Sequence, residues 1–231
     1  MPPFSGSPAR KTLEKLKRAL AQRGVIVYSH ASASRKERMC FINSVKAERE
    51  LLLTHVEAEQ LINALGATQD IPGEIAEVGT YRGASARLLR NYAAPGKVLH
   101  VFDTFSGLPE PGSDDAKFNR GEFACSLEEV QRYLGHNGIK YHVGMFPQSV
   151  DDEVRRMRFS FVHLDVDLYE GTLECLRFFY PRMTVGGFIV SHDFGADRAP
   201  GVMKAFAEYF RPLHVPYMQL SGYQGMALKL A

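Results

Sequence analysis

Between residues 73 and 210, short apolar runs alternate with longer segments in which apolar residues return every three or four positions. The short runs predict buried β-strands, and the longer segments predict helices that pack by one face. Five strands are expected, at 73–79, 97–103, 139–144, 159–165 and 186–193. Because helices separate them, we predict a mostly parallel sheet with helices on both faces.

The chain on either side of this region follows other patterns. Two apolar runs, at 214–220 and 224–230, flank Ser-Gly-Tyr and predict a closing antiparallel hairpin at one edge of the sheet. Before residue 73 the pattern predicts helices and connecting segments: a helix at 7–24, an extended piece at 25–29, a loop at 31–38 and one long helix at 45–67.

This organisation predicts three parts of the chain. Pro, Ser and Gly dominate the start, so residues 1–8 are expected to be a disordered tail. Residues 9–65 are expected to form a helical extension. Residues 66–231 are expected to form one α/β domain, a size that allows a substantial core.

The overall charge is balanced but unevenly distributed. The 28 Lys and Arg residues against 26 Asp and Glu residues give a net charge of +2, which does not favour a nucleic-acid partner. Residues 10–50, however, carry 11 basic and 4 acidic residues. Such a segment is typical of a solvated helical face, and the alternative is a docking surface for an acidic partner.

The cysteines and the hydropathy pattern bear on the compartment. Cys40, Cys125 and Cys175 are widely spaced and odd in number, which favours free thiols in a reducing compartment. No apolar run approaches the length of a membrane-spanning helix, and the first residues lack the apolar stretch of a signal peptide. We therefore expect a cytoplasmic protein without a membrane partner.

Candidate chemistry lies at the strand ends, because ligands bind beyond the carboxyl ends of parallel strands. The segment EVGTYRGAS, residues 77–85, follows the first strand. Gly79 and Gly83 suit a tight turn into a helix whose free N–H groups attract an anion. Glu77 can face a cation. A site for both charges suits an amino-acid zwitterion, and the spacing G-x-x-x-G departs from the dinucleotide fingerprint.

The second strand ends in an acid, Asp103. An acid at this place commonly accepts hydrogen bonds from ribose hydroxyls, although Asp also initiates turns. Together with the Gly turn, Asp103 favours a nucleoside attached to a zwitterion, a description that fits S-adenosylmethionine.

The segments EVGTYRGASARLL, VFDTFSGLPEP and HLDVDLYEGT resemble the macrocin O-methyltransferase family of S-adenosylmethionine-dependent methyltransferases. The resemblance extends over residues 47–200. It implies a seven-stranded Rossmann-like sheet, a hydroxylated small-molecule acceptor such as a sugar of a natural product, and a homo-oligomer such as a dimer.

The resemblance also implies where the cofactor lies. The methionine end is expected at Glu77, Gly79, Gly83 and Ser85, and the ribose at Asp103. The cofactor-binding residues that we expect all lie at or just after strand ends: Glu77, Gly79, Thr80, Tyr81, Gly83, Ser85, Asp103, Thr104, Gly144 and Asp165.

A divalent metal, usually Mg²⁺, is further implied beside the transferring methyl group, with Asp165 as one ligand. Family members place two adjacent acids after the fifth strand, and here that pair is His192-Asp193. We therefore expect Asp165, His192 and Asp193 to form the catalytic and metal-binding centre. The imidazole could favour Mn²⁺, Fe²⁺ or Zn²⁺, or leave the site without metal and make His192 a general base. Asp167 is interpreted as structural, a cap for the following helix.

Three alternatives to a metal-assisted O-methyltransferase stay open. One is transfer to nitrogen or carbon without a metal, with His192 as the base. Another is a non-catalytic module that binds the cofactor. The third, a nicotinamide oxidoreductase, would require the dinucleotide glycine spacing, which is missing at residues 77–85. Residues 114–126 are polar and are expected to cover the site as a lid.

Overall fold

The computed structural model describes residues 8–23 and 32–230. Most of the predicted tail, and the predicted extended piece at 25–29, lie outside the described residues. Contacts between Cα atoms divide the chain into two compact units, Met1–Cys40 and Phe41–Ala231. This division differs from the expected boundary at 65/66, because helix α3 (His55–Gly66) packs against helix α4 and strand β5 in the second unit.

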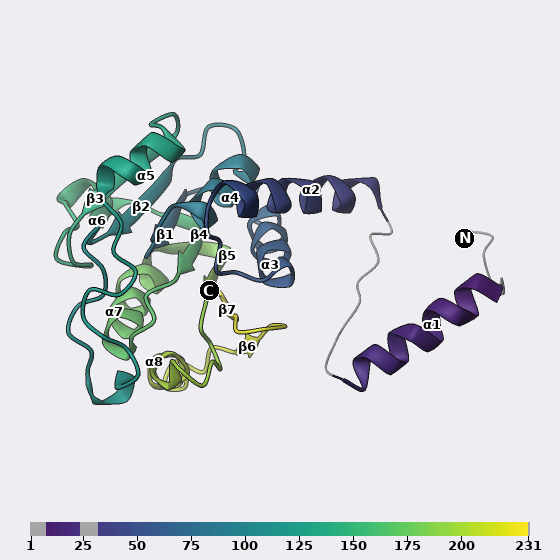
Figure 1. Cartoon of the computed structure of the whole chain (residues 1–231). Helices are drawn as coiled ribbons and strands as arrows, with labels where there is room; N and C mark the ends of the chain where they lie inside the picture. The colour runs from purple at the N-terminus through teal and green to yellow at the C-terminus, as the bar shows by residue number, and fades with distance from the viewer. Residues whose placement is uncertain (1–7, 24–31, 231) are drawn as a thin grey trace. The chain divides into compact units, whose positions relative to one another are not determined.

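The helices and strands follow one another as shown in Figure 1. The α-helices are α1 Pro8–Ala21, α2 Ala33–Glu48, α3 His55–Gly66, α4 Ala84–Tyr92, α5 Leu127–Leu134, α6 Asp152–Arg156, α7 Tyr169–Phe179 and α8 Pro200–Phe210. The strands are β1 Glu74–Val78, β2 Leu99–Asp103, β3 Ile139–Val143, β4 Phe159–Leu164, β5 Met183–Ser191, β6 Tyr217–Gln219 and β7 Gly225–Leu228. Two short 3₁₀ helices lie at Ser113–Asp115 and Tyr180–Arg182.

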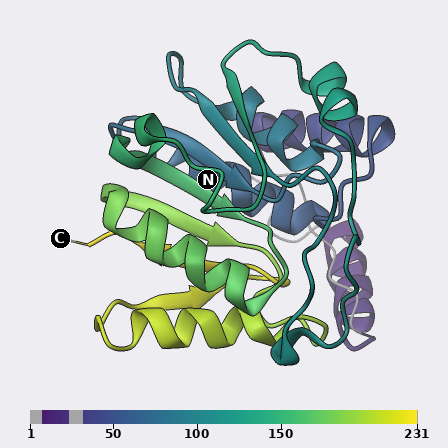
Figure 2. The same ribbon diagram turned by 90° about the vertical axis from the view of Figure 1, so that its left-hand side faces the viewer.

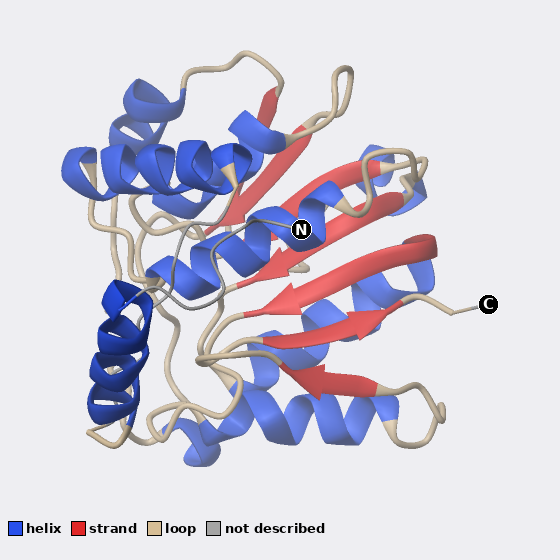
Figure 3. Cartoon of the chain, turned by 90° about the vertical axis from the view of Figure 1, so that its right-hand side faces the viewer, coloured by secondary structure: helices blue, strands red, loops and turns tan. Residues whose placement is uncertain are grey.

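The strands form one seven-stranded sheet in the order β3-β2-β1-β4-β5-β7-β6. The first five strands run parallel, and β7 pairs antiparallel with both β5 and β6 (Figure 3). Helices α7 and α8 pack together on one face of the sheet, and α3 and α4 on the other (Figures 2 and 3). The predicted fold class, with its antiparallel closing hairpin, is confirmed.

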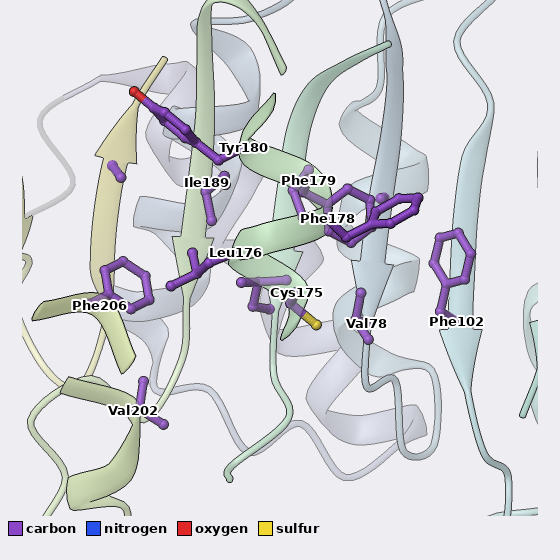
Figure 4. Packing of buried hydrophobic residues seen from close by; sticks show 14 of the residues in the cluster. Val78, Phe102, Cys175, Leu176, Phe178, Phe179, Tyr180, Ile189, Val202 and Phe206 are labelled. Carbon is purple, nitrogen blue, oxygen red and sulfur yellow. The ribbon is translucent and has the colours of Figure 1, made fainter. Parts of the chain in front are cut away.

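One large hydrophobic cluster of the core lies between the sheet and the α7–α8 pair. Every residue of the central strand β4 is buried, as expected for a parallel strand covered on both faces. Phe102, Phe159 and Phe179 are fully buried, and the ring of Phe179 contacts each of the other two edge to face. Figure 4 shows Phe102 and Phe179 within this packing. The same cluster includes Val78, Phe102 and Leu164, so it anchors the carboxyl ends of β1, β2 and β4, where the candidate site lies. None of the helices among the described residues combines the length and apolarity needed to cross a bilayer.

Two predictions before residue 73 are wrong. The segment 31–38 is largely helical, because the Ser32 hydroxyl accepts the N–H of Arg35 and starts α2. The single helix expected over 45–67 is two helices. A capping box begins the second: the Thr54 side chain accepts the N–H of Glu57, whose carboxylate accepts the N–H of Thr54.

His100 should make stability depend on pH. Burial, and then the charge of His142, lower the pKa of His100 to about 4. The unfolded chain takes up a proton near pH 6.5 while the folded chain does not, so stability falls as the pH drops from about 6.5 towards 4. We expect urea denaturation to show a loss of about 2 kcal/mol between pH 7.5 and pH 5 in excess of that of His100→Phe. Equal losses in both proteins would contradict this assignment.

Candidate active site

A cavity of about 620 Å³ opens at the carboxyl ends of the parallel strands. Eight of the expected site residues line it: Gly79, Tyr81, Asp103, Thr104, Gly144, Asp165, His192 and Asp193. Because these residues come from β1, β2, β3, β4 and β5 or the turns that follow them, the parallel sheet brings them together.

Four of the expected cofactor-binding residues do not line the cavity: Glu77, Thr80, Gly83 and Ser85. Glu77 is fully buried, and its side chain contacts the turn after β1 from the interior of the protein. Its carboxylate is 2.9 Å from Nδ1 of His163 and accepts the hydroxyl of Thr80 at 2.8 Å. A side chain satisfied in this way stabilises the turn and does not face the cavity.

The turn after β1 passes very close to the end of β4. Gly79 has a φ of +80°, and a Cβ atom at this position would lie 1.9 Å from the carbonyl oxygen of Asp165. Only glycine allows both the left-handed conformation and this approach. The close approach sets Asp165 directly beside the glycine turn.

Asp103 holds the same turn from the neighbouring strand. Its Oδ2 accepts the N–H groups of Thr80 at 2.7 Å and Tyr81 at 3.2 Å, and its Oδ1 accepts the N–H of Phe105 at 2.7 Å. Burial raises the pKa of Asp103, although these backbone hydrogen bonds oppose the rise. A carboxylate has room for about four hydrogen bonds, so Asp103 can also accept one from a ligand.

Asp165, His192 and Asp193 form the charged centre of the cavity. Nδ1 of His192 lies 3.1 Å from Oδ1 of Asp165 and 3.1 Å from Oδ2 of Asp193. Burial opposes the charge on His192, but the two carboxylates outweigh burial and raise its pKa to about 11. Burial likewise opposes the charge on Asp165, while His192 holds the pKa of this carboxyl below its ordinary value.

A protonated imidazole cannot accept another proton at neutral pH. The arrangement of this centre therefore argues against His192 as the general base. As a donor set, one imidazole and two carboxylates fit a divalent cation, since the three ligand atoms lie within 4.8 Å of one another. Such a cation would have to displace the proton from His192.

Asp167 belongs to this centre, although the sequence suggested a structural cap. Helix α7 begins at Tyr169, whose N–H donates to Asp115 and not to Asp167. Asp167 has a φ of +59° in a turn closed by a hydrogen bond from Leu168 to Val166, and it lines the cavity. Burial and then the carboxylates of Asp193 and Asp165 raise the pKa of Asp167 well above its ordinary value.

The predicted lid lies against the cavity. Asp115, Phe118, Glu122 and Phe123 from this segment line it. Arg198, in the loop between β5 and α8, pairs with Glu122 and stacks 4.3 Å above the Phe118 ring. Arg198 could not be predicted from the sequence, because 76 residues separate it from its ion-pair partner.

Solved structures define the class of the fold. The O-methyltransferase NovP superposes with a TM-score of 0.71 at 21% identity, covering 84% of this chain and 89% of that one. The calicheamicin methyltransferase CalS11 superposes with a TM-score of 0.64 at 19% identity, covering 99% of each chain. The fold is therefore that of the Rossmann-like methyltransferases.

Sequence comparison identifies the family within this class. The chain belongs to the macrocin-O-methyltransferase (TylF) family, whose model matches residues 53–218. A tetracenomycin-C rhamnosyl 4'-O-methyltransferase from Streptomyces olivaceus is 31% identical, with 55% of each chain covered. The demethyldecarbamoylnovobiocin O-methyltransferase of Streptomyces niveus is 27% identical, with 54% of each covered. The chain spans about half the length of these curated relatives.

Proposed function

We propose that this protein transfers a methyl group from S-adenosylmethionine to a hydroxyl group of a sugar or another natural-product intermediate. The observation that carries the proposal is that one cavity contains both Asp103 and the centre of Asp165, His192 and Asp193. Membership of the TylF family, and relatives named for methylating a rhamnosyl unit and a novobiocin precursor, support oxygen as the acceptor atom.

Asp103 and the glycine turn favour one orientation for the proposed S-adenosylmethionine. Asp103 would accept hydrogen bonds from the ribose, and the glycine turn at Gly79 would let the amino-acid end approach the backbone. The cofactor supplies an electrophilic methyl group on a sulfonium, and Asp165 would lie near that positive charge. The protein's own part is to align the acceptor with the methyl group and to remove a proton.

A divalent metal is the finer part of the proposal. Asp165, His192 and Asp193 would hold the ion, which would make a bound acceptor hydroxyl more acidic. Asp167 is the proposed proton acceptor, because its carboxylate lines the same cavity beside these residues. The family resemblance additionally supports a homo-oligomer.

Replacing Asp103 with Ala should weaken cofactor binding. The change removes the proposed ribose acceptor and the hydrogen bonds to Thr80 and Tyr81, which hold the turn in shape. We expect calorimetry to show an affinity for S-adenosylmethionine at least about tenfold lower, from the loss of about 1.5–3 kcal/mol. Asp152→Asn, an exposed change in α6, is the control and should bind normally. Unchanged binding in Asp103→Ala would remove Asp103 from the cofactor site.

The activity itself is tested with S-adenosylmethionine labelled in the methyl group. The purified protein is incubated with a panel of glycosides that carry free sugar hydroxyls, and label is sought in the sugar. Label on an oxygen supports the proposal. Label on nitrogen or carbon alone would favour the alternative transferase. Binding of the cofactor without any transfer would favour a binding module, and binding of NAD in its place would favour an oxidoreductase.

A further inference from the structure

Two arginines lie side by side at the amino ends of the parallel strands, at the other end of the sheet from the cavity. Arg158 directly precedes β4, and Arg182 directly precedes β5. These strands pair in parallel with Phe159 opposite Met183, so the residues just before them are neighbours as well. Neither arginine lines the cavity. They therefore belong to a separate surface of the protein.

Carbonyl groups at the ends of helices hold both guanidinium groups in place. Arg182 donates from Nε to the carbonyl of Arg155 at 3.0 Å and from Nη1 to that of Phe178 at 2.7 Å. Its guanidinium group also stacks 4.1 Å above the centre of the Phe178 ring. Arg158 donates from Nη1 to the carbonyl of Pro181 at 3.0 Å. A guanidinium group has five N–H donors, so these bonds leave most of the donors for a ligand.

Arg155 brings a third positive charge to the same place. It lies in the last turn of α6, it is exposed, and its own carbonyl accepts the bond from Arg182. Burial, and then the charges of Arg155 and Arg158, lower the pKa of Arg182. Like charges held this close repel one another, and an anion bound among them would remove the repulsion.

The three arginines have no acidic partner of their own. Among residues 8–23 and 32–230, no carboxylate forms an ion pair with any of them. Two acids near α6 are engaged elsewhere: Asp151 accepts the N–H of Val154 at 2.9 Å, and Glu153 pairs with Lys140 at 2.9 Å. The positive charge of this group is therefore uncompensated by the chain itself.

We infer that Arg155, Arg158 and Arg182 form a binding site for an oxyanion of the phosphate type. Guanidinium groups bind phosphate oxygens through paired N–H···O bonds, and their fixed planar shape favours this geometry. Three positive charges favour a phosphate or diphosphate dianion over a single carboxylate. The anion is either free or carried by a larger molecule. The site is independent of the proposed methyl transfer, because it lies outside the cavity.

Calorimetry with sodium pyrophosphate tests this site, with the ionic strength kept constant by sodium chloride. We expect saturable binding to the wild type and about tenfold weaker binding to Arg158→Gln. Arg155→Gln should weaken binding in the same way. The matched control is Arg177→Gln, the same chemical change at an exposed arginine that already pairs with Glu174 at 2.8 Å, and its affinity should be that of the wild type.

Three results would overturn the inference. The first is the absence of saturable binding at millimolar pyrophosphate. The second is an equal affinity in the wild type, Arg155→Gln and Arg158→Gln. The third is competition with S-adenosylhomocysteine, which would place the anion in the cavity. We expect S-adenosylhomocysteine to leave pyrophosphate binding unchanged. None of these measurements depends on methyl transfer, so the proposed function stands or falls separately.

A second measurement avoids variants, in case a substitution disturbs the fold. In the ¹⁵N-labelled wild type, pyrophosphate should shift the Nε–H signal of Arg182 and leave that of Arg198, beside the cavity, in place. An unmoved Arg182 signal would overturn the inference. Comparison of inorganic phosphate with glycerol 3-phosphate then distinguishes the two sources of the anion. A shift of the Arg182 signal by either supports the site, and the tighter of the two is the preferred form.

Discussion

Replacing Asp165 with Asn is expected to lower the rate of methyl transfer about a thousandfold, as removal of one charge-stabilising group from a reacting centre does. Asp165 lies at the end of β4, and its Oδ1 is 3.1 Å from Nδ1 of His192. An amide in its place keeps the shape but removes the negative charge that faces the imidazole and the proposed sulfonium. The rate is measured with the labelled cofactor and the acceptor that the glycoside screen identifies.

The lower rate of Asp165→Asn should come from the chemical step and not from loss of folding or of cofactor binding. We expect Asp165→Asn to retain the wild-type melting temperature to within a few degrees and to bind S-adenosylmethionine measurably. Asp152→Asn, in exposed α6, carries the same chemical change away from the cavity and should keep full activity. Normal turnover by Asp165→Asn would show that the reacting centre is elsewhere.

Gly79→Ala is expected to cost about 3–5 kcal/mol of the free energy of unfolding, enough to unfold much of the protein. Two effects add. A left-handed conformation, here with a φ of +80°, costs about 1–2 kcal/mol for a residue with a Cβ atom. The new Cβ atom would also lie 1.9 Å from the carbonyl oxygen of Asp165, so β1 and β4 must separate.

Gly96→Ala isolates the first of these effects. Gly96 has a φ of +87°, but nothing lies within 4 Å of a Cβ atom built there. Urea denaturation should therefore show a loss of about 1–2 kcal/mol for Gly96→Ala and a clearly larger one for Gly79→Ala. Equal losses would mean that the close approach at Asp165 contributes nothing to stability.

Much of the fold could be predicted from local patterns. The apolar runs at 73–79, 97–103 and 159–165 became β1, β2 and β4, because buried parallel strands need continuous apolar side chains. The errors arose where a single polar residue determines the point at which a helix begins. The apolar face of 45–67 continues past the point where Thr54 and Glu57 start a new helix, and the pattern Thr-x-x-Glu was the available sign.

The candidate centre could also be predicted in part. Asp165 and the pair His192-Asp193 end adjacent parallel strands, so the order of strands alone brings them together. Glu77 shows the limit of this argument, because a strand end does not determine which way a side chain turns. The carboxylate turned inward to His163. Asp167 was misjudged for a similar reason, since its left-handed conformation has no sequence signal.

The remaining contacts depend on long-range packing. Glu57 and His192 are 135 positions apart, and their proximity depends on how α3 packs beside β5. The ion pair between Arg198 and Glu122 of the lid segment likewise depends on how distant parts of the chain pack together. No local pattern encodes such pairs, because many helix positions could equally have faced the site.

The most direct test of the account is a crystal structure of the protein with S-adenosylhomocysteine. We predict that the ligand lies in the cavity at the carboxyl ends of the strands, with its ribose hydroxyls bonded to Asp103 and its sulfur towards Asp165, His192 and Asp193. A ligand bound outside this cavity, or one whose sulfur points away from these three residues, would contradict the account.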